Sequence, residues 1–195
     1  MTAPADITAQ KRALRRRLRE ARRAVDVRQR RLAAEAIAER AIALPELTGA
    51  TAVLLYAATP EEADPSVLET ALRARGARIA FPRVSGVRTL TLHWVDDAAM
   101  LEPAAFGIRE PAATAPQAAV TGLSAVVAPG VAFDARCNRL GQGGGYYDAL
   151  LAALPAGVPV IGIAYDEQIA EAVPHAEADR PVDVVITPTR VLRAR

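Results

Sequence analysis

Residues 123–130, LSAVVAPG, form a short and almost continuous apolar run that ends in proline and glycine. A run of this length without alternation is typical of a strand that is covered on both faces. The same pattern recurs at residues 51–58, 77–84, 158–165 and 182–188. Strands that are buried on both faces belong to parallel sheets, so these segments predict a central, mostly parallel sheet.

Amphipathic segments between these runs predict the helices that cover the sheet. Helical patterns are expected over residues 65–75, 145–153 and 166–172. The alternation of strands and helices favours an α/β fold, a three-layer α/β/α sandwich. Residues 89–95, TLTLHWV, alternate in polarity, which predicts a half-exposed edge strand. No repeat or linker divides the chain, so residues 1–195 are expected to form a single domain.

The N-terminal segment predicts two basic helices. The first is expected over residues 8–24, with Thr8 as its N-cap. Its buried stripe consists of Leu14, Leu18, Ala21 and Val25. The second helix is expected to begin at Asp26, with Gln29 completing a capping box, and to end before Pro45.

Charge is distributed unevenly along the chain. Residues 11–31 hold eleven of the 24 basic residues and two of the 22 acidic residues, a net charge of +9, whereas the rest of the chain carries −7. This segment is suited to attract an anion: nucleic acid, a membrane surface or a nucleotide phosphate. At 100° per residue Lys11, Arg15 and Arg22 lie beside the apolar stripe, where they can reach a ligand held against the core. For Arg12, Arg16, Arg17, Arg19 and Arg23 a solvated face is the simpler interpretation.

Composition excludes several kinds of chemistry. One cysteine, Cys137, and two histidines provide no protein-only zinc site, and no G-x-S-x-G elbow is present. No apolar run approaches the roughly 18 residues that span a bilayer. Residues 1–10 lack the layout of a secretory signal. We therefore expect a cytoplasmic protein without a membrane partner.

A glycine-rich loop at residues 139–145 follows one predicted strand and precedes a predicted helix. In open α/β sheets, ligands bind outside the carboxyl ends of the strands. Glycines let backbone N–H groups approach a ligand, so a phosphate chain is the expected guest. The loop is neither a Walker A motif nor a Rossmann fingerprint, since Tyr146 stands where the third glycine would be. A tight surface turn is the alternative for such a cluster.

Residues 129–148, PGVAFDARCNRLGQGGGYYD, resemble the hallmark segment P-G-x-x-F-[DS] … R-[LI]-G-x-G-x-G-Y-Y-D of the 5-formyltetrahydrofolate cyclo-ligase family. Further matches follow in the family's order: KRALR at 11–15, EEAD at 61–64, FPRV at 81–84, FGIREP at 106–111 and DRPVDVVIT at 179–187. Ala149 and Pro65 depart from the family pattern, where arginine and threonine are usual.

The resemblance implies an enzyme that uses MgATP to convert 5-formyltetrahydrofolate into 5,10-methenyltetrahydrofolate, releasing ADP and phosphate. ATP is then a co-substrate and Mg²⁺ a cofactor, and we expect small-molecule partners only, no nucleic acid, and a monomer. The γ-phosphoryl group activates the formyl oxygen, N10 closes the ring, and no enzyme nucleophile is needed. Positioning and charge neutralisation are left to the protein.

The resemblance also implies roles for individual residues. The implied ATP-binding residues are Lys11, Arg12, Ala13, Leu14, Arg15, Arg139, Leu140, Gly141, Gln142, Gly143, Gly144, Gly145, Tyr146 and Tyr147. The implied folate-binding residues are Ala57, Glu62, Gly143, Gly144, Gly145, Tyr146 and Tyr147. Asp148 and Asp179 match the Mg²⁺ carboxylates, and Lys11, Arg139 and Tyr147 match catalytic positions. Lys11 is also the single lysine beside 23 arginines, and a compact ammonium suits a phosphate oxygen.

Two alternatives remain at this point. A nucleic-acid-binding protein that uses the basic helix predicts salt-dependent binding without ATP turnover. A different ATP-using ligase or kinase on the same fold would share the phosphate and metal residues but not the folate contacts.

Overall fold

The structure is a computed structural model that describes residues 4–176 and 179–194. Its helices are α1 (Pro4–Ala24), α2 (Val27–Ile42), α3 (Ser66–Ala74) and α4 (Tyr146–Ala152), with short 3₁₀ turns η1 (Ala98–Met100), η2 (Ala105–Gly107), η3 (Val120–Gly122) and η4 (Asp166–Gln168). The strands are β1 (Ala52–Leu54), β2 (Arg78–Gly86), β3 (Thr89–Trp94), β4 (Glu102–Pro103), β5 (Arg109–Glu110), β6 (Gln117–Ala118), β7 (Ala125–Ala128), β8 (Ala132–Phe133), β9 (Arg139–Leu140), β10 (Val160–Ile163), β11 (Val184–Ile186) and β12 (Val191–Arg193).

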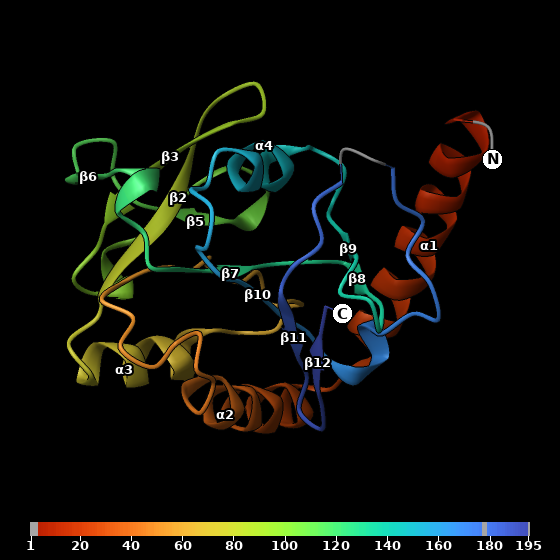
Figure 1. Ribbon diagram of the computed structural model, residues 1–195, viewed down its shortest axis with the longest axis horizontal. Helices are drawn as coiled ribbons and strands as arrows, with labels where there is room; N and C mark the ends of the chain where they lie inside the picture. The colour runs from red at the N-terminus through yellow and green to blue at the C-terminus, as the bar shows by residue number, and fades with distance from the viewer. Residues whose placement is uncertain (1–3, 177–178, 195) are drawn as a thin grey trace.

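An eight-stranded sheet forms the centre, in the order β12-β11-β10-β7-β1-β2-β3-β6 (Figure 1). Neighbours from β11 to β2 pair in parallel. The outer strands β12, β3 and β6 pair antiparallel to their neighbours. The predicted mostly parallel sheet is therefore confirmed.

Strand residues alternate between two apolar cores, one on each face of the sheet. In β1, Val53 belongs to the core that includes Ile37 of α2 and Leu68 of α3. Leu54 belongs to the core that includes Leu150 of α4. Figure 1 shows α2 and α3 on one face and α4 on the other. These two helical layers around the sheet are the predicted α/β/α sandwich, and each buried leucine or isoleucine stabilises it by about 1.5–3 kcal/mol.

Helix α1 stands at one end of the molecule (Figure 1) and has its own small core. Leu14 and Leu18 pack there against Leu140 of β9 and other buried residues outside the eight-stranded sheet. The helix begins at Pro4, whose fixed φ suits a first helical turn, so the prediction that Thr8 caps it is wrong. Helix α2 has the predicted capping box of Asp26 and Gln29.

Two predicted elements differ from the structure. Strand β3 is not the edge of the sheet, because the two-residue strand β6 pairs with it and buries His93. The helix expected over residues 166–172 is only the turn η4. The buried side-chain amide of its last residue, Gln168, donates to the carbonyl oxygens of Gly130 and Val131. The chain after it is extended and pairs with Phe133.

Among the described helices, none combines the length and the apolar character that crossing a bilayer requires.

Candidate active site

A buried aspartate builds the turn that leads into the glycine loop. The carboxylate of Asp134 accepts backbone N–H bonds from Arg136, Asn138 and Val173 at 2.9–3.0 Å, and a side-chain bond from Asn138 at 2.9 Å. These bonds hold Cys137 at a φ of 62°, a left-handed conformation that few side chains adopt. The turn pairs β8 with β9 and so directs the following loop toward α1.

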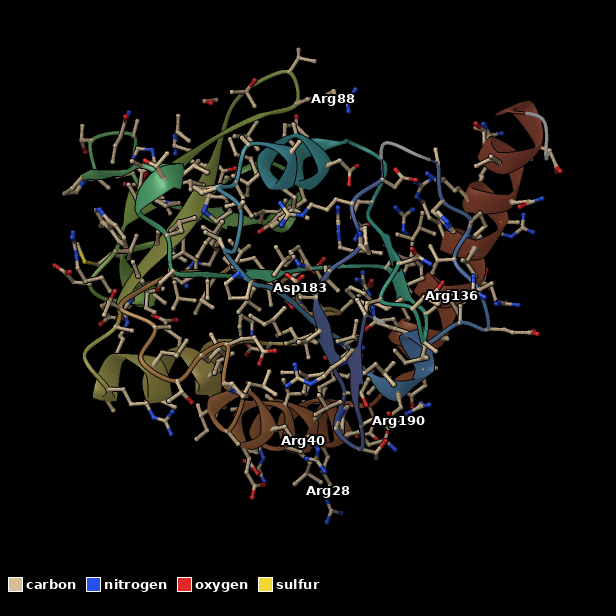
Figure 2. The ribbon with its side chains drawn as sticks, viewed as in Figure 1. Arg28, Arg40, Arg88, Arg136, Asp183 and Arg190 are labelled. Carbon is tan, nitrogen blue, oxygen red and sulfur yellow. The ribbon has the colours of Figure 1, made fainter. Side chains whose placement is uncertain are left out.

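The glycine loop between β9 and α4 is surrounded by arginines. Gly143 and Gly145 have φ values of 108° and 71°, so the loop needs glycine at both positions. The guanidinium groups of Arg139, Arg15 and Arg88 lie against Gly141, Gly143 and Gly145, respectively. Arg88 comes from the hairpin between β2 and β3 (Figure 2). Cations from three separate elements thus converge on one loop.

The basic helix is tied to this loop by hydrogen bonds. Arg15 Nε donates to the carbonyl oxygen of Gly141 at 2.9 Å. Arg19 donates to the side chain of Gln142 at 2.6 and 3.1 Å and to its carbonyl oxygen at 3.2 Å. Arg19 is half-buried, so part of its side chain is solvated as expected, while its guanidinium binds Gln142 of the loop.

Two ion pairs flank the loop. Lys11 pairs with Asp179, and Arg139 pairs with Asp148. Burial alone would raise the pKa of Asp179, but hydrogen bonds from Lys11 and from the N–H of Ala176 outweigh it and lower that pKa. Burial lowers the pKa of Arg139, against the attraction of Asp148. Arg139 Nε is buried and has no hydrogen-bond partner within the described chain. Cationic and anionic groups are thus placed side by side at one site.

The two aspartates are suited to Mg²⁺ only with help from other ligands. Burial lowers the pKa values of Arg15 and Arg139, and the charges of Asp148 and Asp179 oppose this lowering at both arginines, so the two aspartates belong to one site. Over residues 4–176 and 179–194, no group of three potential metal-ligating side chains occurs. Mg²⁺ usually keeps several waters and takes one or two carboxylates plus phosphate oxygens. A two-carboxylate site therefore fits Mg²⁺ bound together with a phosphate chain.

Glu62 and Tyr147 lie close to each other beside the loop. One Glu62 carboxylate oxygen accepts the N–H of Thr59 at 3.1 Å, and the other lies 3.4 Å from the side-chain nitrogen of Gln142. Burial and the nearby Glu62 raise the pKa of Tyr147, against a lowering by Arg139. The Tyr147 hydroxyl is buried and lacks a hydrogen-bond partner among the described residues. Ala57 packs against the same core as Tyr147.

The structure distributes the residues named from the sequence over three environments. Those it brings together around the loop are Lys11, Arg15, Glu62, Arg139, Gln142, Tyr147, Asp148 and Asp179. Tyr146 lies against Gly144. Arg12 and Ala13 are exposed on α1, whereas Leu14 and Leu140 are buried in the core below that helix. The roles of these residues stay predictions.

Two arginines around the site, Arg19 and Arg88, were not predicted to reach it, whereas Arg22 was placed beside the apolar stripe with Lys11 and Arg15. Arg19 follows Lys11 by eight residues, about two helical turns, so its spacing along α1 carried a usable signal. Arg88 lies in a hairpin tip without any motif, and no sequence pattern indicated that it reaches Gly145.

The fold and the site define an α/β protein with a cation-lined glycine loop. The sequence model of the 5-formyltetrahydrofolate cyclo-ligase family matches residues 7–188. The 5-formyltetrahydrofolate cyclo-ligase of Escherichia coli K12 is 28% identical over 179 residues, covering 89% of this chain and 98% of that one. The enzyme of the same name from Mycolicibacterium smegmatis is 30% identical over 151 residues, covering 74% and 77%.

A solved structure is also similar. The 5,10-methenyltetrahydrofolate synthetase of Aquifex aeolicus aligns with a TM-score of 0.81 at 33% identity, covering 95% of this chain and 93% of that one. The chain therefore belongs to the 5-formyltetrahydrofolate cyclo-ligase family, and it is an enzyme.

Proposed function

We propose that this enzyme uses MgATP to convert 5-formyltetrahydrofolate into 5,10-methenyltetrahydrofolate, with release of ADP and phosphate. The observation that carries the proposal is the glycine loop with arginines from three elements against its glycines and the Glu62 carboxylate beside its Gln142. A phosphate chain needs the cations and the backbone N–H groups of such a loop. A reduced folate offers donors to a carboxylate. Both substrates of the reaction thus find matching groups.

On the nucleotide side, Lys11, Arg15 and Arg139 bind the phosphates of ATP. Lys11 and Arg139 are held in ion pairs, and the same cations turn to phosphate oxygens when the nucleotide binds. Asp148 and Asp179 are then released to hold Mg²⁺, which supplies neutralising charge to the phosphate chain. The unpartnered Nε of Arg139 supports this assignment, since a phosphate oxygen satisfies it.

On the folate side, Glu62 accepts hydrogen bonds from the guanidine-like edge of the pterin ring. Ala57 provides an apolar contact, and the unpartnered hydroxyl of Tyr147 hydrogen-bonds to the folate near its reacting end. Burial raises the pKa of the Tyr147 hydroxyl, and Glu62 lies close enough to add to this shift. The pterin ring and the formyl group are thereby oriented together.

The chemistry needs orientation and charge stabilisation rather than a protein nucleophile. The formyl oxygen attacks the γ-phosphorus, ADP leaves, and an iminium phosphate forms. N10 then attacks the formyl carbon and loses its proton, and phosphate leaves as the ring closes. Arg139 and Lys11 stabilise the charge on the transferred group. Cys137 takes no part, because it is fully buried and burial raises the pKa of its thiol to about 11.

The test is spectroscopic. Purified protein is mixed with MgATP and 5-formyltetrahydrofolate, and the near-ultraviolet band of the methenyl product is followed together with ADP. We expect both to appear in equal amounts, and neither when ATP is omitted or Mg²⁺ is chelated. Folded protein that forms no methenyl band would refute the proposal. ADP formation without the band would instead favour a different ATP-using enzyme, and salt-sensitive RNA binding without ADP would favour the nucleic-acid alternative.

A further inference from the structure

We propose that Arg22 is a positioning residue for folate binding, which acts by fixing the carboxylate of Glu62. The inference rests on the proposed function, since it takes Glu62 as the residue that receives the pterin ring. Arg22 lies in the last turn of α1, and its side chain is 4% exposed. A charged side chain at such a position is rare and is normally paired.

The partners of Arg22 are two adjacent glutamates. Its Nη1 lies 3.6 Å from a carboxylate oxygen of Glu62, and its Nη2 lies 3.6 Å from one of Glu61. Both are ion-pair distances that are too long for hydrogen bonds. Within the described chain, Nε and Nη1 have no hydrogen-bond partner. The buried guanidinium is thus held by charge and packing, with unused donors beside the Glu62 carboxylate.

The backbone that carries Glu62 is held in place by contacts that do not involve Arg22. Arg23, which is 64% exposed, holds Glu61 with a hydrogen bond of 2.9 Å. Arg30 of α2 donates to the carbonyl oxygen of Pro60. The hydroxyl of Tyr165 donates to the backbone carbonyl oxygen of Glu62 at 2.8 Å. The backbone around residues 60–62 is therefore fixed by other groups. What Arg22 adds is a positive charge at the Glu62 side chain.

This charge decides where the Glu62 carboxylate points. Thr59 N–H binds one of its oxygens, and Arg22 and Gln142 lie near the other. Without Arg22, the second oxygen keeps only the long contact to Gln142 and is free to turn toward water. A carboxylate that receives two donors of a pterin edge must keep both oxygens oriented, because bidentate recognition depends on geometry. Loss of Arg22 should therefore weaken folate binding more than ATP binding.

The experiment compares Arg22→Met with Arg22→Lys and with the control Arg16→Met, at an exposed arginine of the same helix. Methionine keeps the length of the side chain without its charge, and lysine keeps the charge. We expect Arg22→Met to raise the KM for 5-formyltetrahydrofolate about tenfold or more, as for the loss of a charged partner, with the KM for ATP changed less than about threefold. Arg22→Lys should restore part of the affinity for folate, and Arg16→Met should leave both constants unchanged.

A double-variant cycle separates positioning from a structural role. In a Glu62→Gln background, Arg22→Met should raise the KM for 5-formyltetrahydrofolate little further, because the carboxylate on which Arg22 acts is gone. The inference would be overturned if Arg22→Met raised the folate KM by the same factor in the wild-type and Glu62→Gln backgrounds. Equal changes in the KM values for folate and for ATP would also overturn it. Should Arg22→Met not fold, Arg22→Lys carries the test through the same cycle. If wild-type protein forms no methenyl product, the proposed function fails; an active wild type with an unchanged folate KM in Arg22→Met contradicts only the role of Arg22.

Discussion

At the scale of single residues, Lys11 links the two ends of the chain. It lies in the second turn of α1 and pairs with Asp179, 168 positions later. Asp148 has the same kind of partner in Arg139. Under the proposed function, each of these side chains serves two states of the enzyme: an internal ion pair before the nucleotide binds, and a contact to phosphate or metal afterwards.

We predict that Lys11→Ala and Asp148→Asn each lower turnover at least about 100-fold, because Lys11 neutralises the transferred phosphoryl group directly and Asp148 is the proposed ligand of the Mg²⁺ that neutralises the phosphate chain. Turnover is measured as the rate of methenyl formation at saturating substrates. Arg17→Ala is the control, since Arg17 is exposed on the same helix. Folding of each variant is checked by its thermal transition. Near wild-type turnover in both variants would mean that the nucleotide lies elsewhere.

Cys137 should be unreactive in the folded enzyme. It is fully buried, and burial raises the pKa of its thiol to about 11. The thiol is therefore protonated at neutral pH, and a thiolate is the reactive form. We expect no alkylation by iodoacetamide over the time in which the same thiol is fully labelled in denaturant. Rapid labelling of native protein at neutral pH would contradict the buried position.

Helical periodicity was enough to predict some of the site residues but not all. Lys11 and Arg15 lie beside the buried stripe of α1, and the spacing alone placed them there. Spacing placed Arg22 beside the same stripe, but its ion pairs with Glu61 and Glu62, about 40 positions away, could not be read from local spacing. Arg88 reaches the loop only because the β2–β3 hairpin extends over the start of α4.

At the scale of elements, one carboxylate joins the turn between β11 and β12 to η4. Asp166 accepts hydrogen bonds from Thr187 at 2.5 Å, from Thr189 at 2.7 Å and from Arg190, labelled in Figure 2, at 3.4 Å. Burial alone would raise the pKa of Asp166, but these hydrogen bonds outweigh it and lower the pKa below its ordinary 3.8.

The sign of this shift predicts how stability depends on pH. Because the folded pKa is depressed, the carboxylate stabilises the fold above pH 3.8, and the stabilisation is lost as the pH falls through the lower folded value. We expect Asp166→Asn to lower the melting temperature near neutral pH and to have a smaller effect below pH 3.8. Thermal unfolding followed by circular dichroism over this range is the measurement. A difference that grows on acidification would contradict the assignment.

The elements were predictable where the pattern is local. The strands that form the middle of the sheet are apolar runs, and α2 has its capping box in the sequence. Two predictions failed because a distant partner decides the structure. The strand β6 covers β3, and Gln168 ends η4 by bonding to residues almost 40 positions earlier.

At the scale of the whole molecule, one aromatic ring joins the central sheet to the β8–β9 hairpin that carries the loop. Phe133 of β8 is fully buried. Its ring lies so close to Gly130 and Gly162 that a Cβ at either position would be 2.5 Å from a ring carbon. Gly162 is in β10, so the packing of the hairpin on the sheet depends on the absence of a side chain there.

We predict that Gly162→Ala destabilises the protein by about 1–3 kcal/mol, because the ring must shift in a close-packed core. The melting temperature should fall accordingly, whereas the control Gly122→Ala, with open space around its position, should change it little. Phe133→Leu combined with Gly162→Ala should recover part of the loss. A Gly162→Ala variant as stable as wild type would show that the hairpin is not held by this contact. The single domain and the monomer expected from the sequence stay predictions.

The position of α1 also has a consequence for the order of folding. Arg15 and Gly141 are joined by a hydrogen bond across 126 positions, and Lys11 and Asp179 by an ion pair across 168. Contacts across such separations form late, because a long loop must close first. During synthesis α1 leaves the ribosome before α2, α3 and α4, yet its partners Gly141 and Asp179 follow only 126 and 168 positions after the residues that bind them. We therefore expect the nascent chain to complete its active site late, when the segment around Asp179 reaches α1.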